Sequence, residues 1–299
     1  MKLVTFEQNG SIFPGVIKGD YVIKLTSFVS QRDLNFTCHK CLLPLIEVSD
    51  ERRMGLLRDE LGSISDEMLA KLACDGQAFH TGGVRLRAPI LRPPAVFCLG
   101  FNFRSHAPEL KRPVPEVPVI FTKPSMAVVG PDDNIVLPRV ATRVDYEVEL
   151  TVVIGKGGKK IPKEEAYSHV FGYTVLNDIT ARDIQQRDFA LMRPWLRSKG
   201  FDSFAPIGPC ITTADELTNP MDIELKLTVN GEQRQKSRTT DMVFDIPTVI
   251  EYISSFTTLE AGAIIALGTP EKIGQLQDGD LVEATVEGIG TLRNKAVLE

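Results

Sequence analysis

Apolar and polar residues alternate most regularly in the run DYEVELTVVIG, at residues 145–155. Alternate residues of an extended strand lie on opposite faces, so the apolar residues of this run share one face. Glu147 and Glu149 share the other face, where like charges repel unless a cation or water lies between them. Taken alone, such a pair is more typical of a strand that faces solvent. Thr151 and Val153 follow at the same phase of the alternation, however, which indicates that this face is not uniformly exposed.

The patterning of the rest of the chain predicts many strands and few helices. Short apolar runs at the start are separated by NG and GD turn signals, as in strands joined by tight turns, and residues 47–75 then have the apolar spacing of helices. From residue 96 onward strand patterns dominate, and helices are expected only at 162–170, 180–190 and 246–256. This order of elements predicts a β-rich α+β protein with a sandwich-like or barrel-like body.

A boundary between two domains is expected between residues 80 and 95, where glycines and prolines cluster. We therefore predict a small α+β N-terminal domain at residues 1–88 and a larger domain at residues 89–299, and the 299 residues of the chain are enough for both. The N-terminal part contains no motif that indicates a catalytic or binding site.

The composition is that of a globular protein, with 43% hydrophobic and 24% charged residues. A formal net charge of -5 argues against a nucleic-acid partner, because phosphate binding needs a clustered basic surface. The five cysteines are scattered, as in proteins of a reducing compartment, and the lone pair of Cys38 and Cys41 lacks the further ligands of a zinc site. No apolar run has the length of a membrane span. We expect a cytoplasmic protein that binds neither nucleic acid nor a membrane.

A third carboxylate extends the glutamate pair into a candidate metal site. Asp178 ends the apolar run VFGYTVLND, at a place where a side chain can project from the end of a strand. Three hard oxygen donors from two strands suit Mg²⁺ or Mn²⁺, which keep coordination positions open for water and substrate. The spacing does not choose between these two metals.

Five blocks of sequence now carry a resemblance to a known family. They follow in the order DYEVELTVVIG, GYTVLNDITARDIQQRD, RSKGFDSFAPIGP, LTVNGEQRQ and LGTPEKIG, within residues 95–294. In order and spacing this part of the chain resembles the fumarylacetoacetate hydrolase superfamily, and the preceding segment resembles the variable N-terminal domain of its longer members. The resemblance implies a mixed β-sandwich roll as the C-terminal domain. It also implies a divalent metal at Glu147, Glu149 and Asp178, a 2-oxo acid or 1,3-dicarbonyl substrate, and a homodimer.

A candidate catalytic pair lies in the block GFNFRSHAPEL, where His106 and Glu109 are three positions apart. In a helical turn such residues face the same side, and a carboxylate beside an imidazole orients it and raises its basicity. A lone H-x-x-E is more typical of an ordinary surface loop. The resemblance reverses this interpretation, because the hydrolases of the superfamily have a water-activating His-x-x-Glu pair at this place, on a lid segment.

Further site residues are expected around the metal. Thr180 is expected to cap a helix on which Arg182 and Gln185 share one face, with Arg182 suited to bind a substrate carboxylate. The resemblance places Lys123 and Lys199 near metal and substrate, where Lys199 would stabilise developing negative charge. The remaining candidates are Thr269, as a contact of the substrate carboxylate, and the single tryptophan Trp195, which either lines the pocket or is a core aromatic residue.

The reaction that these residues favour is hydrolysis of a C–C bond in a 2,4-dioxo acid, such as an acylpyruvate or fumarylacetoacetate, through a metal-bound enolate. The same site could instead decarboxylate or tautomerise oxaloacetate, or isomerise a diacid of the 2-hydroxyhepta-2,4-diene-1,7-dioate type. Two alternatives of other classes are a non-catalytic protein that binds oxo acids and an acidic interaction module with a structural cation. Retention of all the site residues argues against the first, and Mg²⁺-dependent loss of the enol absorbance of an acylpyruvate would discriminate against the second. The loop after GTP, with the sequence EKIGQLQDGD, is shorter than in many members of the family. Because this loop helps to shape the pocket, the identity of the substrate is left undecided.

Overall fold

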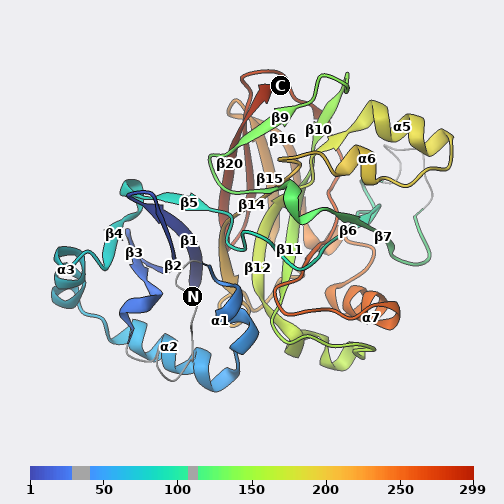
Figure 1. Cartoon of the computed structure of the whole chain (residues 1–299). Helices are drawn as coiled ribbons and strands as arrows, with labels where there is room; N and C mark the ends of the chain where they lie inside the picture. Colours follow the sequence, from blue (N-terminus) through green and yellow to red (C-terminus); the bar gives the residue numbers. More distant parts are fainter. Residues whose placement is uncertain (29–40, 107–113) are drawn as a thin grey trace.

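The computed structural model describes residues 1–28, 41–106 and 114–299, and in this part of the chain a sheet of twelve strands runs through the molecule (Figure 1). Its strands are β1 (Lys2–Gln8), β2 (Ser11–Lys18), β3 (Tyr21–Lys24), β4 (Ala78–His80), β5 (Arg85–Arg87), β6 (Val96–Gly100), β7 (Val119–Lys123), β8 (Val128–Val129), β11 (Val148–Ile154), β12 (Val170–Asn177), β14 (Ala205–Thr213) and β17 (Ile264–Ala266). Neighbours pair in the order β4-β3-β2-β1-β14-β12-β11-β17-β6-β7, while β5 pairs with β1 and β8 with β14.

Strands β11 and β12 lie in the middle of this sheet, and every residue of both is buried. They pair antiparallel, with Glu149 opposite Leu176. A strand that is covered on both faces has largely apolar residues at successive positions, because both faces lie in the core. This explains the sequence LTVVI after Glu149. The solvent-facing interpretation of the glutamate pair is wrong, because Glu147 and Glu149 are 5% and 1% exposed.

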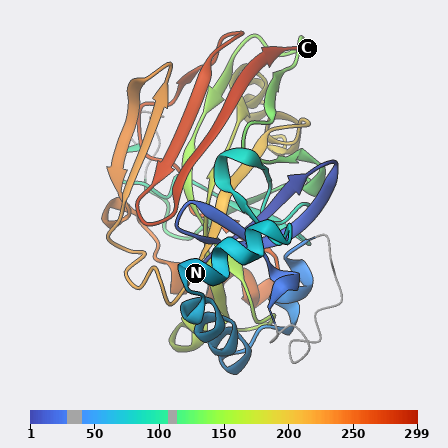
Figure 2. The ribbon, with the colours of Figure 1, turned by 90° about the vertical axis from the view of Figure 1, so that its left-hand side faces the viewer.

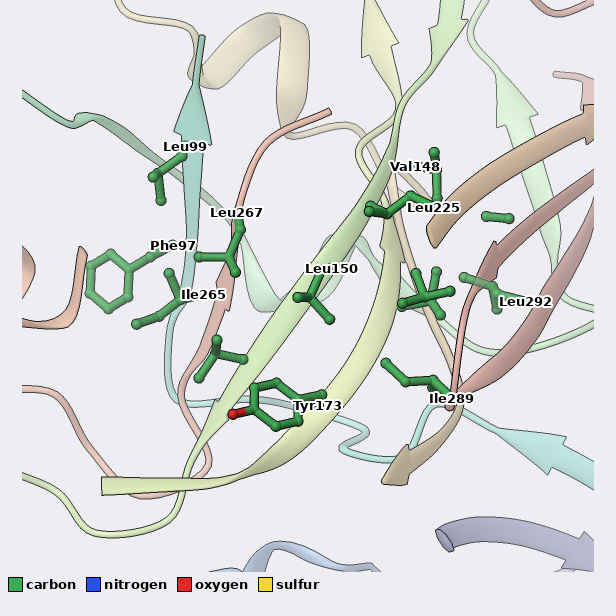
Figure 3. Close-up of a cluster of buried hydrophobic side chains, with 14 of the residues drawn as sticks. Phe97, Leu99, Val148, Leu150, Tyr173, Leu225, Ile265, Leu267, Ile289 and Leu292 are labelled. Carbon is green, nitrogen blue, oxygen red and sulfur yellow. The ribbon is translucent and has the colours of Figure 1, made fainter. Parts of the chain in front are cut away.

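A second sheet packs against one face of the large sheet (Figure 2, largely orange and red). It consists of β9 (Asn134–Leu137), β15 (Glu224–Val229), β16 (Glu232–Arg238), β19 (Leu281–Val286) and β20 (Gly290–Leu298), in the order β16-β15-β19-β20-β9. Buried residues alternate with less buried ones along β15 and β19, as expected when one face meets the core. Figure 3 shows this core, in which Leu150 and Tyr173 of the large sheet lie in one cluster with Leu225 and Leu292 of the second.

The N-terminal strands extend the large sheet, because β1 pairs with β14 and places Leu3 opposite Ile211. Three helices lie beside these strands, at the lower left of Figure 1: α1 (Leu43–Val48), α2 (Glu51–Ser63) and α3 (Asp66–Cys74). A second apolar cluster joins Leu45 and Leu57 of the helices with Leu3, Ile207 and Ile211 of the sheet. The sheet is thus continuous across the predicted boundary at residue 88, and the division into two domains stays a prediction.

The strand predicted at residues 145–155 is divided at Glu147. The preceding residues form β10 (Val144–Tyr146), which pairs with β13 (Thr180–Ala181) and β18 (Gly274–Gln275) in a small three-stranded sheet. The following residues form β11, which pairs with β12 and β17 in the large sheet. The chain therefore passes from one sheet to another at Glu147, and this residue lies at the junction.

Two of the three helices predicted after residue 96 are confirmed, as α5 (Arg182–Ala190) and α7 (Ile246–Phe256). The third forms a 3-10 helix, η5 (Lys163–His169), and a short helix α6 (Leu196–Lys199) follows α5. Thr180 is not the predicted cap, because it belongs to β13 and the residue before α5 is Ala181. The other 3-10 turns are η1 (Leu25–Ser27), η3 (Thr81–Gly83), η4 (Ser125–Ala127) and η6 (Thr239–Asp241). In the described part of the chain, every helix is too short or too polar to cross a membrane.

Candidate active site

A cavity of about 300 Å³ opens beside the junction at Glu147. Strands β6 and β7, helices α5 and α6, the start of β11 and the segment after β17 all contribute to its wall. The described residues that line it are Leu99, Gly100, Phe101, His106, Phe121, Glu147, Glu149, Arg182, Gln185, Gln186, Phe189, Ala190, Trp195, Lys199 and Thr269. Most of the predicted site residues therefore share one cavity.

The three predicted metal ligands converge. Glu147 lies between β10 and β11, Glu149 in β11, and Asp178 directly after β12. The backbone N–H of Asp178 donates to the carbonyl of Glu147 (2.8 Å), which fixes the end of β12 against the junction. One carboxylate oxygen of each residue lies within 4.8 Å of those of the others, and all three side chains are buried.

Both predicted lysines contact this triad directly. Lys123 Nζ donates to Asp178 Oδ1 (2.5 Å) and to the carbonyl of Ile179 (3.0 Å). Lys199 Nζ donates to Glu147 Oε2 (2.9 Å) and to Asp178 Oδ2. Lys199 lines the cavity, whereas Lys123 is not among its lining residues and bonds Asp178 instead.

Burial and charge have opposite effects on these ammonium groups. Burial, together with the charge of Lys199, lowers the pKa of Lys123, and Asp178 offsets this only in part. Burial also works against the charge on Lys199, but Asp178 and Glu147 together raise the pKa of Lys199 above its usual value. Lys199 is therefore held as a cation between two carboxylates, at the cavity wall.

Arg182 is held by the protein on all sides. Its Nε donates to Asp145 Oδ2 (2.8 Å), its Nη1 to Gln185 Oε1 (2.5 Å) and its Nη2 to Glu147 Oε1. Burial works against ionisation of Glu147, but Lys199, Arg182 and His106 outweigh it and hold the pKa of this carboxyl far below its usual range. Gln185 therefore holds Arg182, and Arg182 holds Glu147, while the predicted binding of substrate by these two residues stays a prediction.

Glu149 is the electrostatic exception in the triad. It accepts a hydrogen bond from the backbone N–H of Gly268 (2.8 Å), and among the described residues it has no ion pair. Burial and the neighbouring carboxylates of Asp178 and Glu147 raise the pKa of Glu149 well above its usual value. Three buried carboxylates that each bring one oxygen within 4.8 Å of the others are a donor set that a hard divalent cation fits.

His106 is buried and lines the cavity near Glu147. The segment before it is fastened to other parts of the chain. Asn102 Nδ2 donates to the carbonyl of Leu267 (2.8 Å), and Ser105 Oγ donates to Asp241 Oδ2 (2.7 Å). Glu109, the predicted partner of His106, lies outside the described residues.

Thr269 lines the cavity after β17, and its predicted contact with a substrate carboxylate stays a prediction. It is held by Gln235, which was not predicted from the sequence. Gln235 of β16 is fully buried, and its Nε2 donates to Thr269 Oγ1 (3.1 Å) and to the carbonyl of Pro270 (2.9 Å). Its Oε1 accepts from the backbone N–H of Val148 (3.1 Å), between the two glutamates. One side chain from the second sheet thus links both sides of the site.

Two further residues of the site were also missed. Asp145 is fully buried and binds both Arg182 and Arg143, and Thr180 Oγ1 donates to Glu147 Oε1 (3.1 Å). Both belong to quoted motifs, and the pairing of β10 with β13 places them opposite each other. The available signal was the presence of an extra acid and a hydroxyl inside blocks that already held ligands.

Cys98 of β6 is fully buried beside the triad. Burial, together with Asp178 and Glu149, raises the pKa of the Cys98 thiol well above its usual value. The thiol is therefore neutral, and a cysteine nucleophile, which needs the thiolate, does not fit this site.

The comparisons with known proteins agree with this geometry. The family model for the C-terminal part of fumarylacetoacetate (FAA) hydrolase matches residues 95–297, about two thirds of the chain. The protein therefore belongs to the fumarylacetoacetate hydrolase family, as its motifs indicated.

Sequence relatives cover most of this matched part. An uncharacterised protein of Pyrococcus abyssi is 52% identical over 209 residues, which are 70% of this chain and 92% of that protein. An oxaloacetate tautomerase of Bacillus subtilis is 43% identical over 223 residues, which are 71% of this chain and 73% of that protein.

Solved structures of the family cover the whole chain. The fumarylacetoacetate hydrolase of Exiguobacterium antarcticum is 34% identical with a TM-score of 0.79, and covers 100% of both chains. A 5-carboxymethyl-2-hydroxymuconate delta-isomerase of Mycobacterium smegmatis is 34% identical with a TM-score of 0.76, again with 100% of both chains. The maleylpyruvate hydrolase of Sphingobium sp. SYK-6, solved with manganese(II) and pyruvate, is 30% identical with a TM-score of 0.76, and the match covers 100% of this chain and 99% of that one. Relatives with this fold thus include hydrolases, isomerases and tautomerases.

Proposed function

We propose that the protein is a divalent-metal-dependent hydrolase that cleaves a C–C bond in 2,4-dioxo acids of the acylpyruvate type. The observation that carries this proposal is that His106, a candidate general base, lines the same cavity as Glu147 and Glu149. A base, a candidate metal site and a buried ammonium group around one cavity are the parts that hydrolytic cleavage needs.

Glu147, Glu149 and Asp178 would hold the metal, Mg²⁺ or Mn²⁺, and the manganese in the Sphingobium relative supports this class of ion. When bound, the cation would polarise the substrate carbonyl and stabilise negative charge on its oxygen. Lys123 and Arg182 would then act mainly on the ligands Asp178 and Glu147, to which they already donate hydrogen bonds.

The protein's own side chains account for the proton transfers. His106 takes a proton from water, and the resulting hydroxide adds to the C4 carbonyl of the substrate. The C3–C4 bond then breaks, its electron pair passes to C3 as an enolate, and the Lys199 ammonium stabilises the negative charge. The protonated His106 returns its proton to C3, and the new carboxylic acid releases its own proton to solvent, so the products are a 2-oxo acid and a second carboxylate.

A second candidate function is keto–enol tautomerisation of oxaloacetate, which the 43% identity with the Bacillus subtilis tautomerase favours. This reaction needs only a proton transfer at C3 and an enolate-stabilising site, without attack by water. The homodimer and the cytoplasmic location expected from the sequence remain proposals beside either function.

Proton NMR of the products tests the proposal. The purified protein is incubated with Mg²⁺ or Mn²⁺ and with acylpyruvates of several chain lengths or with oxaloacetate. Hydrolysis gives pyruvate and the free carboxylate in equal amounts, whereas tautomerisation accelerates only the exchange between keto and enol forms. Faster oxaloacetate exchange without cleavage of any acylpyruvate would replace the first function by the second, and no turnover of either substrate class would overturn both.

A further inference from the structure

One side of the cavity is aromatic. The ring of Trp195 lies 5.7, 5.1 and 5.5 Å, between centroids, from the rings of Phe101, Phe121 and Phe189. All four side chains line the cavity, and each is partly exposed rather than sealed in the core. We call these four residues the aromatic wall. Trp195 is thus a cavity residue, which decides between the two interpretations that its sequence position left open.

The aromatic wall begins directly beside the charged end of the cavity. Lys199 Nζ, which bonds Glu147 and Asp178, lies 5.0 Å from the centroid of the Phe121 ring. A ligand whose oxo-acid head occupies the charged end therefore extends its remaining atoms along the four rings.

Charge is distributed unevenly along the cavity. Among its described lining residues, the ionisable side chains are His106, Glu147, Glu149, Arg182 and Lys199, all around the metal triad. Among the described residues that line this cavity, the aromatic wall and its neighbour Ala190 provide no cation for a second carboxylate. Arg193, which lines an adjoining hollow with Phe121 and Trp195, is paired with Asp188. A carboxylate desolvated against these rings would be strongly disfavoured, whereas an apolar group would gain from burial.

The size of the cavity also favours a ligand with an apolar tail. Its volume of about 300 Å³ lies at the lower end of the range that encloses drug-sized ligands. That is more space than a four-carbon oxo acid fills, so the site has room for a tail beyond the reacting carbons.

We propose that the aromatic wall is a specificity site for an uncharged apolar tail. The preferred ligands are then 2-oxo and 2,4-dioxo acids with an aliphatic or aromatic group at the far end, rather than dicarboxylates. This inference rests on the proposed function for the placement of the oxo-acid head, and it assigns the substrate class within that function.

The single tryptophan allows ligand binding to be measured apart from turnover, because Trp195 is the only indole fluorophore of the chain. The matched ligands are 2-oxohexanoate and 2-oxoadipate, which have six carbons each, differ in a terminal methyl or carboxylate, and lack the 4-oxo group that hydrolysis needs. In the presence of Mg²⁺ we expect 2-oxohexanoate to change the Trp195 emission and to bind at least about tenfold more tightly than 2-oxoadipate. Equal affinities, or tighter binding of 2-oxoadipate, would overturn the proposal.

A variant with a new cation on the wall tests the cause of this preference. Phe189→Arg is expected to bind 2-oxoadipate at least as tightly as 2-oxohexanoate, because the guanidinium can pair with the distal carboxylate. Ala190→Arg places the same charge at an exposed lining position and serves if the first variant does not fold. Phe256→Arg is the matched control, since Phe256 is 56% exposed on α7 and does not line the cavity. An arginine at position 189 or 190 that leaves the preference between the two ligands unchanged would refute the role of the wall.

The outcomes separate this inference from the proposed function. Tight binding of 2-oxohexanoate without cleavage of any acylpyruvate would support the specificity site and refute the hydrolase. Cleavage of acylpyruvates with no preference between the two six-carbon ligands would support the hydrolase and refute the specificity site.

Discussion

The two ends of the cavity are built in different ways. At the charged end, the single carboxylate of Glu147 accepts hydrogen bonds from Arg182, Lys199 and Thr180. The position of each polar group there therefore depends on several others. At the aromatic end, Trp195 is positioned by ring contacts, and its indole N–H makes no hydrogen bond within the described part of the chain.

This difference separates the chemistry from the choice of substrate. Residues in one network of charges couple strongly, so changes at the charged end are expected to be severe and non-additive. Phe121 meets that network at Lys199, whereas the contacts of Trp195 are with other rings, so changes at Trp195 should alter which ligand binds while the metal site stays intact. The substitutions below test this division from the most severe effect to the mildest.

The largest effect is expected for Glu149→Gln. The amide keeps the size and can still accept from Gly268 N–H, but it removes one of the three negative charges that would hold the cation. We expect Mg²⁺ affinity to fall by at least about 100-fold, with loss of all metal-dependent turnover. Isothermal titration calorimetry with Mg²⁺ measures the change in affinity.

Glu283→Gln is the control for that experiment, because Glu283 lies on β19, bonds Thr228 and does not line the cavity. It should bind Mg²⁺ like the wild type. Unchanged Mg²⁺ affinity in Glu149→Gln would remove Glu149 from the ligand set.

The next effect is expected for His106→Ala, which removes the candidate base but none of the three carboxylates. Hydrolysis of acylpyruvates should fall by about 10²- to 10⁴-fold, the usual contribution of a general base. Mg²⁺ affinity should stay within a few-fold of the wild type, since His106 is not one of the clustered ligands. Steady-state kinetics and calorimetry on the same preparation measure both. Undiminished hydrolysis would exclude His106 from the mechanism.

These candidates differ in how far the sequence could reveal them. The metal ligands, His106, Arg182 and Lys199 stand in local motifs. The structure brings all of them except Asp178 to the wall of one cavity, and Asp178 clusters with the two glutamates there. Gln235 also stands in a quoted block, LTVNGEQRQ, but nothing in its surroundings marks it as a site residue, because it lies in the polar run EQRQKSR of an otherwise exposed strand. It reaches the site only because the second sheet packs against the large one, and no local pattern encodes that packing.

The fold, too, could be predicted from the sequence only where a local pattern encodes it. The buried strands β11 and β12 follow from their apolar runs, whereas β14 was not predicted, because APIGPCITT holds two prolines and a glycine that normally argue against a central strand. The break of the predicted strand at Glu147 was missed for a related reason. It arises from pairing with partners distant in sequence, Thr180 for Asp145 and Leu176 for Glu149.

An intermediate effect is expected for Gln235→Leu, which leaves the Thr269 hydroxyl and the Val148 N–H without their partner. An unsatisfied buried group costs about 1–3 kcal/mol of folding stability, and the freed Thr269 should raise KM about tenfold with a smaller change in kcat. Gln233→Leu makes the same substitution at an exposed position of the same strand and should change neither quantity. An unaltered KM in Gln235→Leu would show that Gln235 supports the fold without positioning Thr269.

The mildest effect is expected for Gly100→Ala, at the aromatic end. A methyl group on Gly100 would lie 2.7 Å from the ring of Trp195. The indole must therefore move away from β6, while the backbone of β6 stays in place. We expect a shifted Trp195 emission and about threefold weaker binding of 2-oxohexanoate, roughly the value of one buried methylene, with unchanged Mg²⁺ affinity. Gly55→Ala is the control, because Gly55 lies in α2 with open space around it. Loss of Mg²⁺ affinity in Gly100→Ala would mean that the two ends of the cavity are coupled, and the division between chemistry and substrate choice would then be wrong.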